Sequence, residues 1–327
     1  MPDSRLTTAL ETGAVSLPPA GRIAVYCPLA GVDLSALPKD RVHIVQGFKP
    51  DHDAFAAQGF DVGVAAGGDY AAAVVFLPRS KVQARALIAE AAAHGTVIVD
   101  GQKTDGVESI LRDIRKRAVV SDVTSKAHGK IFAFRGGDFT DWRTDPAGQS
   151  ITGGFTTAPG VFSADGIDPG SAALAAALPV RLTGRIADLG AGWGYLAREI
   201  LTRDGVGELH LIEASHAALE CARANVTDPR ARFHWADATR FTPDTPFDAV
   251  ITNPPFHTSR AADPAIGRAF IAAAARMLKP SGKLWLVANR HLPYEAEAAL
   301  HFLDVQEAAG DKRFKILLAA KPRRSRH

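Results

Sequence analysis

Short hydrophobic runs alternate with a longer helical pattern along the first third of the chain. The runs are rich in apolar and β-branched residues, which is typical of buried strands. They lie at residues 22–26, 42–46, 73–77 and 96–99. Residues 81–94 form a helical pattern that ends at Gly95, a residue type that commonly closes helices. This alternation predicts a parallel sheet with helices on its faces.

The second half of the chain repeats the order of these elements. Three pairs of segments match in turn, namely 21–24 with 184–187, 73–78 with 249–254, and 94–99 with 281–287. One four-residue match is within reach of chance, but matches in the same order indicate a duplicated fold. In this comparison Leu77 takes the place of Asn253, and no glycine-rich loop follows the first strand of the first copy. We therefore expect the N-terminal copy to be non-catalytic.

The two copies are expected to join in a stretch that shows neither the helical nor the strand periodicity of hydrophobic residues. Gly, Pro, Thr and Asp accumulate between Gly136 and Gly160. We place the domains at residues 1–138 and 139–327. In the second domain the expected strands are 185–189, 208–212, 232–235, 247–252 and 283–288, the helices 168–178 and 263–277, and the closing antiparallel hairpin 302–308 with 314–320.

Composition narrows the class of protein. With 327 residues and 46% hydrophobic content, the chain has enough apolar residues for two ordinary cores. No apolar run approaches the roughly 18 to 20 residues of a membrane span, and the N-terminus lacks a signal pattern, so we expect a cytoplasmic protein. Cys27 and Cys221 are isolated and no histidines cluster with them, which argues against a disulfide framework and against a bound metal.

Charge leaves the choice of partner open. The net charge of +3 and the pI near 8.9 permit a nucleic-acid partner without requiring one. Basic residues gather at Arg112, Arg115, Lys116 and Arg117, which we place on a helix, and at Lys126, Lys130 and 321–327. The internal groups are either a solvated face or an RNA contact, and the C-terminal group is expected to be a disordered tail.

A nucleoside site is predicted where the first two strands of the second domain end. Gly190, Gly192 and Gly194 follow the strand that contains Asp188, and alternate glycines let the backbone approach a ligand closely. Glu213 ends the next strand, where an acid can accept hydrogen bonds from both hydroxyls of a ribose.

Two further acids extend this site. Asp237, which precedes Ala238, follows the third strand and can accept a hydrogen bond from an adenine amine. Asp168 stands before Pro169 at the start of an alanine-rich helix, where capping alone explains it. The N-terminus of that helix would also suit a carboxylate, such as the methionyl end of a cofactor. Each acid is unremarkable singly, but with the glycines they indicate an adenosine site.

The segment Asn253–Phe256 predicts a binding loop for a planar amine. It follows a strand-like run, and Pro254 and Pro255 end any strand or helix. The Asn253 side-chain oxygen and the Pro254 carbonyl can accept from one NH2 group, while Phe256 offers a flat face to the ring. An isolated Asn-Pro-Pro more often only ends a strand, but the accompanying glycine loop favours a site.

Together these motifs resemble those of class I S-adenosylmethionine-dependent methyltransferases that act on exocyclic or amide nitrogens. The resemblance narrows to bacterial small-subunit ribosomal RNA guanine-N2 methyltransferases at residues 159–168, 253–257, 287–294 and 313–315. That family pairs an inactive N-terminal methyltransferase-like domain with an active C-terminal one. Two features depart from its pattern, because Trp193 stands at a usually small or aliphatic position and the N-terminal half is short.

The resemblance implies a fold, a cofactor and site residues. The fold is two tandem Rossmann-like α/β methyltransferase domains, the first of them degenerate, and the cofactor is S-adenosylmethionine. Its binding residues would be Asp168, Asp188, Gly190, Ala191, Gly192, Gly194, Glu213, Asp237, Ala238 and Asn253. The catalytic residues would be Asn253, Pro254, Pro255 and Phe256, with Phe162, His257, Asn289 and Arg313 as substrate contacts.

The implied reaction is methylation of a guanine N2 amine in ribosomal RNA, with 16S RNA or the small ribosomal subunit as partner. We expect a monomer that needs neither metal nor membrane. Other acceptors stay open, namely a large-subunit guanine, adenine N6 or a release-factor glutamine, although the last two typically go with Tyr at the position of Phe256. A third class is a ribosome-assembly factor that binds RNA and keeps the cofactor as structure.

Overall fold

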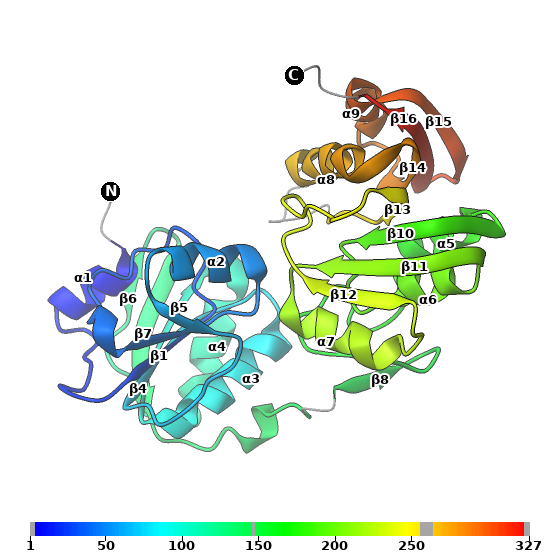
Figure 1. Cartoon of the computed structure of the whole chain (residues 1–327). Coiled ribbons are helices and arrows are strands. Elements are labelled where there is room, and N and C mark those ends of the chain that lie inside the picture. Colours follow the sequence, from blue (N-terminus) through cyan, green and yellow to red (C-terminus); the bar gives the residue numbers. More distant parts are fainter. Residues whose placement is uncertain (1–3, 146–147, 256–263, 324–327) are drawn as a thin grey trace. The chain divides into compact units, whose positions relative to one another are not determined.

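Two compact units make up the chain in the computed structural model, which describes residues 4–145, 148–255 and 264–323. The units are Met1–Gly148 and Gln149–His327, and each is built on its own seven-stranded sheet (Figure 1). The division lies within the stretch 136–160 in which the join was expected, but later than the boundary placed after residue 138. Phe139 and Trp142 explain the difference, because both are buried in a core of the first unit.

The first unit has the strand order β3-β2-β1-β4-β5-β7-β6. Its first five strands pair in parallel, and β7 runs antiparallel to β5 and β6. The strands are β1 (Ile23–Tyr26), β2 (Val42–Val45), β3 (Asp61–Gly63), β4 (Ala72–Phe76), β5 (Thr96–Gln102), β6 (Thr124–Lys126) and β7 (Gly129–Arg135). Helices α1 (Arg5–Glu11) and α2 (Lys49–Ala57) pack on one face, and α3 (Lys81–Ala91) and α4 (Val107–Ile114) on the other.

The second unit has the equivalent order β12-β11-β10-β13-β14-β16-β15, with the last two strands again antiparallel. The strands are β10 (Arg181–Leu189), β11 (Asp204–Glu213), β12 (Ala231–Trp235), β13 (Phe247–Thr252), β14 (Leu278–Asn289), β15 (Phe302–Gly310) and β16 (Phe314–Pro322). One face carries α5 (Pro169–Ala177), α6 (Tyr195–Leu201) and α7 (His216–Asn225), and the other α8 (Pro264–Met277) and α9 (Tyr294–His301). A small hairpin of β8 (Gln149–Ile151) and β9 (Phe155–Thr157) precedes them.

The fold class expected from the sequence is confirmed, including the closing antiparallel hairpin of β15 and β16. The hydrophobic runs located the strands because their apolar residues fill the cores between sheet and helices. The prediction that residues 321–327 form a disordered tail is wrong for the first two of them. Lys321 and Pro322 belong to β16, and Pro322 pairs with Phe302 of β15.

Strand pairing corrects one detail of the internal comparison. Ile23 of β1 pairs with Ala72 of β4, and its counterpart Ile186 of β10 pairs with Ala249 of β13. The structural counterpart of Ala249 is therefore Ala72. The comparison of sequences had instead matched Ala249 with Ala73.

This shift of one residue changes which side chain replaces the predicted amine acceptor. Phe76 takes the place of Asn253, and Leu77 takes the place of Pro254. Residues 71–73 are all alanine, so the sequence could not fix the register. Both replacements are apolar, and the first unit still lacks the polar acceptor.

The first unit keeps the turn geometry of a cofactor loop without its glycines. Cys27 follows β1 with a positive φ of 52°, as Gly190 follows β10 with a φ of 75°. The Cys27 amide donates to the Val45 carbonyl at 2.9 Å, as the Gly190 amide donates to the Ile212 carbonyl at 2.8 Å. This equivalence supports a common origin for the two sheets.

The ligand edge of the first sheet is closed by its own side chains. Gln46 follows β2 at the position that Glu213 occupies on β11, and it is buried. Its amide donates to the Pro28 carbonyl at 2.8 Å, across the turn that follows β1. Val25 stands where β10 has Asp188. The first unit therefore has neither acid of the predicted nucleoside site.

Candidate active site

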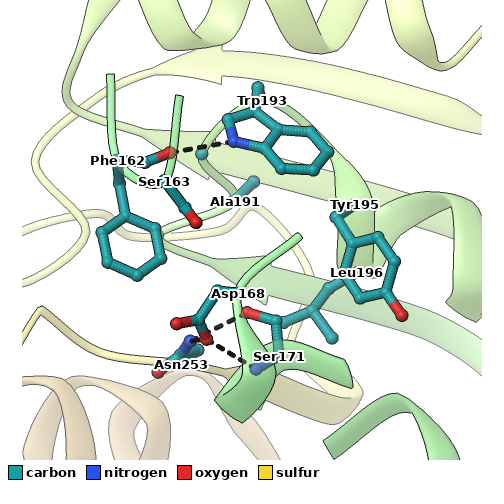
Figure 2. Close-up of a pocket in the computed structure, with 11 residues that line it drawn as sticks. Phe162, Ser163, Asp168, Ser171, Ala191, Trp193, Tyr195, Leu196 and Asn253 are labelled. Carbon is teal, nitrogen blue, oxygen red and sulfur yellow. Dashed lines mark hydrogen bonds between the residues drawn. The ribbon is translucent and has the colours of Figure 1, made fainter. Parts of the chain in front are cut away.

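The predicted site residues gather at one edge of the second sheet. β10, β11 and β13 are parallel neighbours, so their carboxyl ends meet there. A pocket at this edge is drawn in Figure 2. Its lining residues are Phe162, Ser163, Asp168, Ser171, Gly190, Ala191, Gly192, Trp193, Tyr195, Leu196 and Asn253. The glycine loop and the amine-binding loop thus border one cavity.

The glycine loop combines close packing with an open side. Gly192 has a positive φ of 55°, and a Cβ added to it would meet no described atom within 4 Å. A Cβ on Gly194 would instead meet Val226 at 3.0 Å and the Ala222 backbone at 3.3 Å. Gly194 therefore serves helix packing, while Gly192 leaves room for a ligand against the backbone.

Asp188 is a completely buried acid at the end of β10. Neither carboxylate oxygen has a hydrogen-bond partner among the described residues. Burial, reinforced by the nearby charge of Glu213, raises the pKa of Asp188 to about 8. A buried acid with unpaired oxygens is costly in the free protein, which is typical of a functional site.

Glu213 links the second strand to the glycine loop. One carboxylate oxygen accepts from the Gly192 amide at 2.8 Å, and the other accepts from the Ser215 amide at 2.7 Å. Burial raises the pKa of Glu213, and these two amides oppose the shift. Glu213 therefore lies beside the backbone that a nucleoside would approach.

Asp237 and Ala238 lie further from the pocket. Asp237 accepts from the Thr239 amide at 2.8 Å and from the Thr239 hydroxyl at 2.7 Å, so one of its oxygens closes a turn. Ala238 is buried. Among the described residues these two do not line the cavity, and their role in binding adenine stays a prediction.

Asn253 is held firmly at the start of its loop. Its side-chain nitrogen donates to the Asp168 carboxylate and to the Ser171 hydroxyl, both at 2.8 Å (Figure 2). Its side-chain oxygen is buried and has no partner among the described residues. Pro254 is buried and Pro255 is exposed.

Phe256 and His257, expected to contact the substrate, lie outside the residues that the structure describes. Asn289 ends β14 and pairs with Phe314 of β16, which places Arg313 beside it at the same edge of the sheet. Arg313 is exposed, and neither it nor Asn289 lines the described pocket. Their contacts with substrate stay a prediction.

Asp168 caps helix α5, as the sequence suggested. Its carboxylate accepts from the Ser171 amide at 2.7 Å, so the helix N-terminus, which we expected to suit a ligand carboxylate, already holds the carboxylate of Asp168. The same oxygen accepts from Asn253. Asp168, Ser171 and Asn253 therefore form one hydrogen-bonded group. The sequence did not reveal Ser171 as a member, because a serine in the first turn of a helix has no pattern that marks such a contact.

Trp193, an unusual residue in the glycine loop, anchors the segment that covers the pocket. Its indole nitrogen donates to the Phe162 carbonyl at 2.9 Å (Figure 2). Its ring packs against that of Phe155, with the two ring centroids 4.9 Å apart. Asn225 donates to the carbonyls of Trp193 and Thr156, each at 2.8 Å. Phe162 is 58% exposed and lies at the pocket, where a planar substrate could stack on it.

Neither a metal site nor a membrane-spanning helix occurs in the part of the chain that the structure describes. No group of three or more His, Cys, Asp or Glu side chains is arranged to hold a metal ion there. Within the same residues, no helix combines the length and apolar character that crossing a membrane requires.

The strand order, the glycine loop after β10 and the Asn-Pro-Pro loop after β13 define a class I methyltransferase. The chain belongs to the methyltransferase small domain family, whose model matches residues 152–318.

Comparison with individual proteins extends the similarity to the whole chain. Ribosomal RNA small subunit methyltransferase C of Hahella chejuensis is 29% identical over 322 residues, which cover 93% of this chain and 92% of that protein. Ribosomal RNA large subunit methyltransferase G of Streptomyces coelicolor is 36% identical over 168 residues, covering 50% of this chain and 44% of that protein. A solved structure of the T. thermophilus 16S rRNA N2 G1207 methyltransferase with AdoMet and guanosine has a TM-score of 0.76 and 25% identity, over 94% of this chain and 90% of that one.

Proposed function

We propose that this protein transfers a methyl group from S-adenosylmethionine to the N2 amine of a guanine in small-subunit ribosomal RNA. The observation that carries the proposal is the Asn253 amide at the end of β13, whose oxygen is buried and has no hydrogen-bond partner among the residues that the structure describes. The similarity to small-subunit methyltransferases includes both units, whereas the large-subunit relative matches only half of the chain. This difference favours small-subunit RNA over a large-subunit guanine.

The residues of the second unit fit the cofactor. The open side of Gly192 gives a ligand access to the backbone. Within the described part of the chain, the buried side-chain oxygens of Asp188 and Asn253 have no hydrogen-bond partner. We assign the glycine loop and Glu213 to the adenosine part and Asp168 to the amino-acid part. Because Asp168 is an acid, it favours the amino group of that part over its carboxylate. When bound, S-adenosylmethionine supplies a methyl group on a positively charged sulfur.

The amine-binding loop acts on the nucleophile. The N2 lone pair of guanine is delocalised into the ring, so it must be drawn out of conjugation and held in line with the methyl group. The Asn253 oxygen and the Pro254 carbonyl accept hydrogen bonds from the amine and stabilise the positive charge that develops as nitrogen bonds to the methyl carbon. The carbon–sulfur bond breaks with its electron pair on sulfur, and the nitrogen then releases one proton to solvent.

The first unit supports this reaction without catalysing it. Its sheet edge is closed by Gln46, and apolar Val25 and Phe76 replace Asp188 and Asn253. We assign it an RNA-binding or structural role. We place the enzyme in the cytoplasm as a monomer that uses no metal.

Methyl transfer from labelled S-adenosylmethionine tests the proposal directly. The acceptors to compare are naked 16S RNA, assembled small subunits, large-subunit RNA, DNA and a release factor. We expect label only in small-subunit RNA, as N2-methylguanosine, and an Asn253→Ala enzyme about 10² to 10³-fold slower. Label in adenine, in large-subunit RNA or in protein would refute the assigned acceptor. An Asn253→Ala protein that still rescued ribosome assembly in a deletion strain would favour an assembly factor.

A further inference from the structure

We propose that Asp168 and Ser171 are positioning residues that fix the orientation of the Asn253 side-chain amide, so that its nitrogen faces helix α5 and its oxygen faces away. The inference rests on the proposed function, because its purpose is to present the Asn253 oxygen to the substrate amine. It assigns a role to Ser171 and a third role to Asp168, beyond capping α5 and contacting a cofactor.

The two faces of an asparagine amide have almost the same shape and opposite hydrogen-bonding character. Rotation by half a turn exchanges an acceptor oxygen for a donor NH2 group. If Asn253 faced the wrong way, two donors would point at the N–H groups of the amine. An enzyme that depends on this oxygen therefore needs something that distinguishes the two orientations.

The contacts of Asn253 make that distinction. An ionised carboxylate can only accept hydrogen bonds, so the Asp168 side chain requires the NH2 group to face it. The Ser171 hydroxyl receives the second N–H at 2.8 Å, and both hydrogens are then occupied. In the reversed amide, the Asn253 oxygen would face the Asp168 carboxylate at hydrogen-bond distance, and the two acceptors would repel each other.

The position of Asp168 is itself fixed. Its Oδ2 accepts from the Ser171 amide at 2.7 Å, which holds the carboxylate at the start of α5. Pro169, at the first helical position, keeps the backbone there in helical geometry. Ser171 is buried, with 8% of its surface exposed. Asp168 and Asn253 are 85 residues apart in the chain, so helix α5 acts as the fixed support of the loop after β13.

The consequence is an unpaired oxygen that points away from α5. Figure 2 shows the Asn253 nitrogen turned toward Asp168 and Ser171, with the oxygen on the opposite side. This oxygen is buried and has no partner among the described residues. Leaving a buried acceptor unpaired costs stability, and such a cost is expected where a ligand supplies the missing donor.

Two substitutions weaken the orientation while preserving the helix. Asp168→Asn keeps the size of the side chain and a good N-cap, but its amide can also donate to the Asn253 oxygen. Ser171→Ala removes the second acceptor from a position inside the helix. Ser171→Thr restores a hydroxyl at the same position and is the matched rescue variant.

The first measurement reads the orientation without any reaction. In 15N-labelled full-length protein, the side-chain NH2 signals of Asn253 are identified by their loss in Asn253→Ala. We expect slow hydrogen exchange at both protons in the native protein, several-fold faster exchange in Asp168→Asn and Ser171→Ala, and recovery in Ser171→Thr. Unchanged exchange in both weakened variants would overturn the proposal.

The second measurement asks whether Asp168 acts through Asn253. In single turnover with saturating RNA and cofactor, Asp168→Asn should slow methyl transfer about tenfold to a hundredfold, since it replaces a charge-assisted hydrogen bond. The same change in an Asn253→Ala background should have little further effect. An equal loss in both backgrounds would assign Asp168 to cofactor contact alone. Calorimetry with S-adenosylhomocysteine separates the residues further, because Asp168→Asn, which alters the residue assigned to the amino-acid part of the cofactor, should weaken its binding more than Ser171→Ala does.

The two proposals can fail separately. If the native protein methylates none of the RNA acceptors, the proposed function fails, while the exchange of the Asn253 protons still decides whether Asp168 and Ser171 orient the amide. If RNA is methylated but Asp168→Asn and Ser171→Ala leave both exchange and rate unchanged, only the orientation proposal fails.

Discussion

The hydroxyl of Thr252 donates a 2.6 Å hydrogen bond to the carbonyl of Leu189 inside the second sheet. Both residues are fully buried. Leu189 directly precedes Gly190, and Thr252 directly precedes Asn253. The glycine loop and the amine-binding loop therefore start from two strand ends that are joined by a direct bond.

Thr252→Val tests whether this bond sets the spacing of the two loops. Valine keeps the shape and removes a buried donor from the Leu189 carbonyl, so the free energy of unfolding should fall by about 1 to 3 kcal/mol. Misplacement of the two loops should slow methyl transfer about tenfold or more. Urea unfolding and single-turnover kinetics measure the two effects, with Thr252→Ser as control. A lowered stability with an unchanged rate would contradict the link.

Trp193→Phe should loosen the segment that covers the pocket. The substitution keeps an aromatic ring but removes the donor to the Phe162 carbonyl, which costs about 1 kcal/mol. We expect faster hydrogen exchange over residues 155–164 and weaker binding of S-adenosylhomocysteine. Trp235→Phe is the control, since it also removes an indole hydrogen bond, to Ala214. Equal exchange in the two variants would show that Trp193 does not anchor this segment.

Asp188 should make the stability of the cofactor-free protein fall as pH rises. Burial raises its pKa from 3.8 to about 8, so between these values the folded protein holds a proton that the unfolded chain has lost. Asp188→Asn removes the ionisable group. We expect its urea midpoint to exceed that of the native protein at pH 8 and the two to converge near pH 4, while cofactor affinity falls. A native midpoint that rises with pH across this window, with no difference from Asp188→Asn, would be the contrary result.

The pair His210 and His234 should have the opposite effect to Asp188, because it should make stability increase as pH rises. Their rings stack with centroids 5.1 Å apart, and Nδ1 of His210 lies 2.9 Å from Nε2 of His234. Burial lowers the pKa of both, and Arg185, whose guanidinium lies 3.1 Å from His210, lowers that of His210 further, against the opposing effect of Glu208. As pH falls, these histidines bind protons in the unfolded chain before they do so in the folded protein. The free energy of unfolding should therefore have its full value above the ordinary histidine pKa of about 6.5 and decrease below it.

Urea unfolding between pH 5 and pH 8 measures this effect. His234→Gln should flatten the acid side of the stability profile, because one of the two protonatable rings is gone. His291→Gln, at an exposed position, is the matched control and should follow the native profile. An unchanged acid side in His234→Gln would show that the pair does not control it.

Much of the second unit could be predicted because its signals are local. The run at residues 247–252 is apolar and β-branched, and it coincides with β13. Alternating Gly190, Gly192 and Gly194 marked a turn that only glycine adopts readily, and each has a positive φ. The parallel order of the strands then brought the glycine loop and Asn253 to one edge.

Contacts between distant segments could not be predicted. Nothing in the sequence near Ser171 indicates that it would meet Asn253, because that contact depends on the docking of α5. Helix α4 ends at Ile114, so Arg115, Lys116 and Arg117, which were expected on this helix with Arg112, lie beyond its last residue. Arg117 instead forms two hydrogen bonds of 2.6 and 2.8 Å with Asp141. The local pattern of hydrophobic residues predicted whether a segment forms a helix or a strand. Which distant residues it contacts depended on tertiary packing.

The bond between Gln46 and Pro28 has a consequence for the history of the duplication. Restoring an acid at residue 46 would place a carboxylate against the Pro28 carbonyl, so that reversion begins with a loss of stability. No advantage would follow until Val25, Cys27 and Phe76 had also changed. A return of a cofactor site to the first unit would therefore require several substitutions together, and the change at residue 46 alone would lower stability.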